Sequence, residues 1–77
     1  MAKNETDIQM ERLGAVIRER RLALGMTQDG LSQLTRLHRN YIGGIERAER
    51  NVTIISLRKV AEGLDCEAWE LLQEARI

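Results

Sequence analysis

The chain has 77 residues, of which 43% are hydrophobic and 31% charged, a balance typical of a folded domain rather than a disordered segment. Its 12 basic and 12 acidic residues cancel, which excludes a strongly basic nucleic-acid tail but not a basic face. No apolar run approaches the ~20 residues of a membrane helix, and the polar start lacks the apolar region of a signal peptide. We therefore expect a cytoplasmic protein with no membrane partner.

The first helical pattern runs from about Ile8 to Leu24 and is preceded by polar residues 1–7, which we expect to be disordered. Its apolar stripe, at the spacing of one helix face, consists of Leu13, Val16, Ile17 and Leu24. Gly25 follows where a left-handed C-terminal cap is favoured. Residues 8–77 are thus predicted to form a single domain.

Two short helices follow, separated by a tight turn. Thr27 is a suitable N-cap for the first, which is predicted to bury Leu31 and Leu34. The turn Arg36-Leu37-His38 then leads into a helix that begins near Arg39. Its narrow apolar stripe consists of Ile42 and Ile45.

The rest of the chain predicts a loop over residues 48–52 and two more helices. Thr53 is the expected cap of the fourth helix, whose inward residues are Leu57, Val60, Ala61 and Leu64. The fifth carries Trp69, Leu71 and Leu72. The predicted fold is all-α, with five short helices around one core.

Charge is distributed unevenly along the chain. Residues 27–61 contain six basic and three acidic residues, whereas residues 62–77 contain one basic and five acidic residues. A nucleic-acid duplex would attract the first segment and repel the second. Because so short a chain rarely builds a core worth more than ~3–5 kcal/mol alone, we expect self-association, with the acidic end near the subunit contact.

The two short helices and their turn have the organisation of a helix-turn-helix, whose second helix can enter the DNA major groove. Arg39, Asn40 and Tyr41 begin that helix, and Arg47 and Arg50 lie at or beyond its end. Arg can bind the O6 and N7 atoms of guanine, and Asn the N6 and N7 atoms of adenine. We therefore predict DNA recognition by this segment.

These motifs resemble the Cro/C1-type (XRE-like) helix-turn-helix regulators. The resemblance rests on Ile17-Arg18, Arg21, Gly25-Met26-Thr27-Gln28, Leu31-Ser32, Tyr41-Ile42 and Ile45-Glu46. It implies a five-helix lambda-repressor-like DNA-binding domain. Within the family, residues 39–51 are most similar to controller proteins of restriction–modification systems, which are small dimers that regulate their own operon and the endonuclease gene.

The residues and the resemblance together predict a binding surface for palindromic operators. Base contacts are expected from Arg39, Asn40, Tyr41 and Gly44; base or phosphate contacts from Arg36, Arg47, Arg50 and Asn51; and phosphate contacts from Thr27, Gln28 and His38. The resemblance further implies an ion pair between Arg21 and Glu46. It also implies a homodimer built by the last helix, through Trp69 and Leu72, with RNA polymerase a candidate further partner.

Two glycines, Gly43 and Gly44, interrupt the predicted recognition helix, each at a cost of about 0.8–1.0 kcal/mol relative to Ala. Their lack of a side chain would let the backbone approach a groove wall, while Gly44 removes one base-reading side chain.

Two other functions remain open: a phage- or plasmid-type repressor, and an antitoxin-like protein-interaction module. An enzyme is not expected, because the lone His38 and lone Cys66 belong to no reactive constellation. Cys66 is interpreted as a small buried hydrophobe. A metal site, a cofactor and a small-molecule effector are not expected either.

Overall fold

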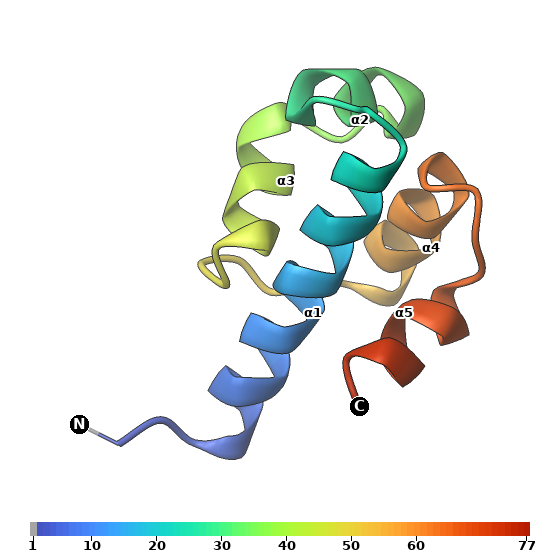
Figure 1. Ribbon diagram of the computed structural model, residues 1–77. Helices are drawn as coiled ribbons and strands as arrows, with labels where there is room; N and C mark the ends of the chain where they lie inside the picture. The colour runs from blue at the N-terminus through green and yellow to red at the C-terminus, as the bar shows by residue number, and fades with distance from the viewer. Residues whose placement is uncertain (1) are drawn as a thin grey trace.

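Five α-helices account for the regular structure of residues 2–77, the part of the chain that the computed structural model describes (Figure 1). They are α1 (Glu5–Ala23), α2 (Gln28–Thr35), α3 (Arg39–Glu46), α4 (Ile54–Gly63) and α5 (Ala68–Glu74). The described residues contain no strand, so the predicted all-α class and the number of helices are confirmed.

The first helix begins earlier than predicted. The Asn4 side chain accepts a hydrogen bond of 2.8 Å from the Asp7 backbone N–H, and the Asp7 carboxylate accepts one of 3.4 Å from the Asn4 backbone N–H. This reciprocal capping box satisfies N–H groups that otherwise lack partners at a helix start. The prediction of disorder through Asp7 is therefore wrong for residues 5–7, which are helical; Met1 lies outside the described residues.

Three further helix ends follow the predicted caps, at Gly25, Thr27 and Thr53. Gly25, which follows the C-cap residue Leu24 of α1, adopts a φ of +71°, where its missing side chain avoids strain. The hydroxyls of Thr27 and Thr53 accept hydrogen bonds from the N–H groups of Gly30 and Ser56, at 2.9 and 3.0 Å. His38 caps α3, because its Nδ1 accepts a hydrogen bond of 3.0 Å from the Asn40 N–H. The starts of both helices of the helix-turn-helix are thus fixed by neighbouring residues.

The core is formed by one set of aliphatic side chains drawn from all five helices and the residues that follow α4 and α5. Its members are Leu13, Ile17, Leu31, Ile42, Ile45, Leu57, Val60, Ala61, Leu64, Leu71 and Ala75. Two predicted members are wrong: Leu24 is 51% exposed and Leu34 is 63% exposed. Leu24 follows the last residue of α1, where the chain turns away, and α2 buries Leu31 and Thr35 instead of Leu34.

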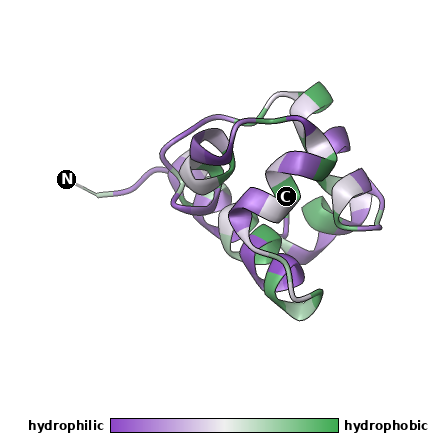
Figure 2. Ribbon diagram, turned by 90° about the horizontal axis from the view of Figure 1, so that it is seen from above, coloured by the Kyte–Doolittle hydropathy of each residue, from purple (hydrophilic) through white to green (hydrophobic). Residues whose placement is uncertain are grey.

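Each of the five helices has its main contacts with two others, so that the contacts form a closed ring. Helix α1 contacts α3 on one side and α5 on the other, while α2 contacts α3 and α4, and α4 contacts α5 (Figure 1). Hydrophobic stretches also reach the outer edge of the bundle (Figure 2). The large hydrophobic side chains that are exposed include Leu34, Ile55 and Trp69. Within residues 2–77, no helix has the length and apolar character needed to span a membrane.

Candidate nucleic-acid interface

The start of α3 presents Arg39 and Asn40 to solvent. Other predicted DNA-contacting residues are exposed around them, on the turn before α3, on the loop after it and at the N-cap of α2. These exposed residues are Thr27, Arg36, His38, Arg47, Arg50 and Asn51. Their DNA contacts stay predictions, but the fold leaves them accessible.

The Arg21–Glu46 ion pair, predicted from the family pattern, is present and buried. Arg21 Nε donates to Glu46 Oε2 at 2.7 Å, and Nη2 donates to Oε1 at 2.9 Å, with side chains 8% and 2% exposed. Arg21 Nη1 also donates to the Met26 carbonyl at 2.8 Å. The hydrogen bond to Glu46 raises the pKa of Arg21, which stays charged. This network ties α1 to the end of α3 and to the segment before α2.

Gln28 belongs to the same network, which differs from its predicted role on phosphate. Its side-chain Nε2 donates to Glu46 Oε1 at 3.1 Å, and the residue is half-buried. One N–H of the side-chain amide is thus bound within the chain, and the predicted phosphate contact of Gln28 stays a prediction. Backbone N–H groups of the first turn of α2 could add to such a contact.

Tyr41 also has a partner inside the protein. Its hydroxyl donates to the Asn51 carbonyl at 3.0 Å, and its ring packs against the core from a half-buried position. The phenol therefore fixes the loop that carries Arg50 and Asn51 relative to α3. The predicted base contact of Tyr41 stays a prediction.

The glycine pair in α3 makes room for protein side chains rather than for a groove wall. A Cβ on Gly43 would lie 2.9 Å from Arg47 Nη1 and 3.1 Å from Gln28 Oε1, and a Cβ on Gly44 would lie 2.5 Å from Arg50 Cγ. Both glycines are buried. The Arg50 side chain covers Gly44, and the predicted base contact of Gly44 stays a prediction. The glycines let Arg47 and Arg50 lie back along α3.

Gly14 positions α3 and was missed by the sequence interpretation. A Cβ at this position would lie 2.5 Å from the Ile45 carbonyl oxygen and 2.7 Å from that of Glu46. Only a residue without a side chain lets the α1 and α3 backbones come so close. The signal was present in the sequence, since Gly14 lies on the same helical stripe as Ile17 and Arg21.

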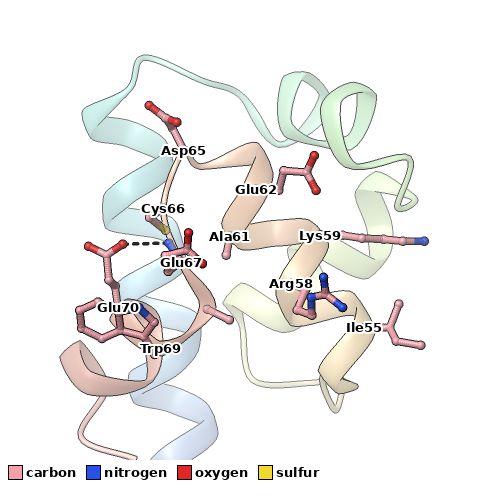
Figure 3. Close-up of a pocket in the computed structure, with 11 residues that line it drawn as sticks. Ile55, Arg58, Lys59, Ala61, Glu62, Asp65, Cys66, Glu67, Trp69 and Glu70 are labelled. Atoms are coloured by element: carbon pink, nitrogen blue, oxygen red, sulfur yellow. Dashed lines mark hydrogen bonds between the residues drawn. The ribbon is translucent and has the colours of Figure 1, made fainter.

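On the other side of the bundle, α4 and α5 line an open groove of about 830 Å³ (Figure 3). Ile55 from α4 is 67% exposed and Trp69 from α5 is 62% exposed, so Trp69 is not a core residue. Leu72, the other predicted interface residue, is half-buried. Cys66 is half-buried rather than fully buried as expected, and burial raises the pKa of its thiol.

Comparison with known proteins agrees with this geometry. Residues 17–68 match the helix-turn-helix family. Control protein C.SmaI from Serratia marcescens is 39% identical over 62 residues, which cover 80% of this chain and 74% of the relative. The structure of the restriction–modification controller protein C.AhdI from Aeromonas hydrophila is 42% identical, with a TM-score of 0.79 over 80% of this chain and 94% of that protein.

A further solved structure shows a relative on DNA. It is the tetramer of the controller protein C.Esp1396I in complex with its natural 35 base-pair operator, and that chain is 38% identical, with a TM-score of 0.78 over 90% of this chain and 96% of its own length. The chain described here belongs to the helix-turn-helix family of DNA-binding transcriptional regulators, and within it to the controller proteins of restriction–modification systems.

Proposed function

We propose that this protein binds a palindromic operator as a homodimer and regulates a restriction–modification operon from the cytoplasm. The observation that carries the proposal is the exposure of Arg39 and Asn40 on the first turn of α3, while the other end of α3 is fixed by the buried Arg21–Glu46 pair. A rigidly held helix that presents an Arg and an Asn side by side suits the readout of guanine and adenine in a major groove.

The dimer contact is proposed to lie on the α4–α5 side. Exposed Ile55 and Trp69 supply apolar area there, and aromatic residues are enriched in the centres of protein interfaces. The acidic segment 62–77 is then covered by the partner subunit rather than turned toward phosphate. Contact with RNA polymerase stays part of this proposal; a slower-migrating ternary complex on operator DNA would support it, and unchanged mobility would contradict it.

Selection of bound duplexes from a random pool tests the proposed function. We expect enrichment of inverted repeats whose half-sites are centred about one helical turn, ~34 Å, apart, because two α3 helices of a dimer reach successive major grooves on one side of the duplex. Arg39→Ala is the matched variant, and it should relax the preference at one position of each half-site. Failure to enrich any repeated sequence would contradict binding as a sequence-specific dimer.

A further inference from the structure

One exposed carboxylate is bound to an arginine of the predicted DNA surface. Arg47 Nε donates to Glu49 Oε1 at 3.1 Å, with side chains 57% and 60% exposed. Residues 27–53 contain two other acidic residues, Asp29 and Glu46, and the Glu46 carboxylate is buried against Arg21. Glu49 is therefore an accessible negative charge located where the proposed function requires phosphate binding.

The turn after α3 holds Glu49 in place. Ala48 adopts a left-handed φ of 61°, and the N–H groups of Ala48 and Glu49 donate to the carbonyls of Ile45 and Gly44 at 3.0 and 2.7 Å. The backbone of Glu49 is thus anchored to the end of α3 rather than free in a long loop. These backbone bonds fix the starting point of the Glu49 side chain, and its carboxylate pairs with Arg47 as an exposed ion pair of ordinary strength.

The Arg47 side chain lies along α3, over Gly43. Its Nη1 lies over Gly43, close enough that a Cβ there would be 2.9 Å away, and Gln28 Oε1 approaches the same point. The guanidinium therefore lies between the start of α2 and the exposed face of α3. From this position it can reach a DNA phosphate, but its charge is already compensated by Glu49.

We propose that Glu49 limits the affinity of this protein for its operator by competing with DNA for Arg47. The inference rests on the proposed function and adds an element of its regulation: the carboxylate sets the protein concentration at which the operator becomes occupied. When DNA binds, Arg47 exchanges a carboxylate for a phosphate, and the negative charge of Glu49 is left beside the duplex. Like charges placed together at an interface lower affinity.

Titration of the selected operator with Glu49→Gln protein tests the inference. We expect binding tighter by about 1.4-fold to 5-fold, from the size of exposed ion pairs and the 1.4 kcal/mol that corresponds to each tenfold change. The gain should shrink as salt rises, because salt screens exposed charges. Glu19→Gln, which removes the same charge from an exposed position on α1, is the matched control and should change the affinity little.

The double variant Arg47→Ala/Glu49→Gln shows whether Glu49 acts through Arg47. Competition for Arg47 predicts that Glu49→Gln improves binding less in the Arg47→Ala background than in the wild type. Equal improvement in both backgrounds would overturn the inference, as would an unchanged affinity for Glu49→Gln in the wild-type background. A wild-type protein that binds no duplex would instead contradict the proposed function itself.

Discussion

The α1–α3 side and the α4–α5 side of this bundle differ in how completely their residues are packed. Between α1 and α3, Gly14 allows close backbone contact, and the buried Arg21–Glu46 ion pair, with the Gln28 amide bound to it, holds the end of α3. Between α4 and α5, exposed Ile55 and Trp69 flank an open groove.

The two sides suit two different tasks, which are holding α3 in place and contacting a second subunit. A recognition helix has to be held rigidly by its own subunit, because a misplaced side chain loses its base contacts. Exposed apolar side chains beside an open groove are suited to contact with a second subunit, which would add burial to the small core of one chain. The following predictions test each side of the bundle.

On the α1–α3 side, Glu46→Ala should cause the largest loss of folding stability. It leaves the Arg21 guanidinium buried without its carboxylate, and breaking such a pair costs about 3–5 kcal/mol. Urea unfolding measures the loss. Glu49→Ala is the matched control, because it breaks an exposed ion pair worth about 0.2–1 kcal/mol. Equal losses in the two variants would mean that the buried network does not hold α3.

On the α4–α5 side, Trp69→Ala should cause the largest loss of self-association. Removal of a large aromatic anchor from an interface typically costs about 2 kcal/mol or more, which weakens self-association by roughly 30-fold. Sedimentation equilibrium measures the dimer dissociation constant. Leu34→Ala removes a similarly exposed apolar side chain on α2 and should leave the dimer intact. A Trp69→Ala protein that dimerises like the wild type would place the subunit contact elsewhere.

Gly14→Ala should destabilise the α1–α3 contact by about 1–3 kcal/mol, because the new methyl group would push against two backbone carbonyl oxygens. Ala has a higher helix propensity than Gly, so helix propensity alone would predict a gain in stability instead of this loss. Gly30→Ala is the control, since a Cβ there meets only the Thr27 hydroxyl, at 3.3 Å. Equal thermal stability of the Gly14→Ala and Gly30→Ala proteins would mean that the close approach of α1 and α3 is not required for stability.

Ala48→Gly should stabilise the protein by about 1 kcal/mol. Ala48 has a φ of 61°, a left-handed conformation that is strained for a residue with a Cβ but not for Gly. Ala15→Gly, at an exposed helical position, should lose about as much by helix propensity. Chemical unfolding of both variants should show that the free energy of unfolding rises in Ala48→Gly and falls in Ala15→Gly. A loss in Ala48→Gly would show that the turn after α3 carries no strain.

Acid should weaken the contact between α1 and α5. Arg20 Nε donates to Glu74 Oε2 at 3.1 Å, and this hydrogen bond holds the pKa of Glu74 below its ordinary value of 4.5. A lowered pKa means that the pair contributes stability above pH 4.5 and loses it as the pH falls through the folded-state value. Because Glu74 is exposed, we expect only about 0.2–1 kcal/mol. Unfolding free energies measured between neutral and acid pH should decline less in Glu74→Gln than in the wild type; parallel curves would exclude the pair as their source.

Local features of the fold were predictable because their causes lie within a few residues. Gly25, Thr27 and Thr53 mark helix ends through backbone conformation or capping, which depend only on neighbouring residues. The start of α1 was placed too late, because the polar composition of residues 1–7 obscured the Asn4–Asp7 capping box. Leu24 and Leu34 show that periodicity identifies a helix without fixing which edge of its apolar stripe a neighbouring helix covers.

The exposure of the candidate DNA-contacting residues was predictable, but the interactions of their side chains within the protein were less so. Arg39 and Asn40 follow from the position of the second helix of the motif. The role of Gln28 depended on whether its amide would reach Glu46, and the roles of Gly43 and Gly44 depended on where the loop places Arg47 and Arg50. Those distances are set by tertiary packing, which a sequence pattern does not encode directly.

The central claim, that the exposed start of α3 reads bases, is tested most directly by titrating Arg39→Ala protein against the selected operator and an unrelated duplex. A base contact predicts a loss of about 1–3 kcal/mol on the operator, larger than the loss on unrelated DNA, where arginine contacts phosphate alone. Unchanged operator affinity, or an equal loss on both duplexes, would contradict the assignment of base readout to Arg39.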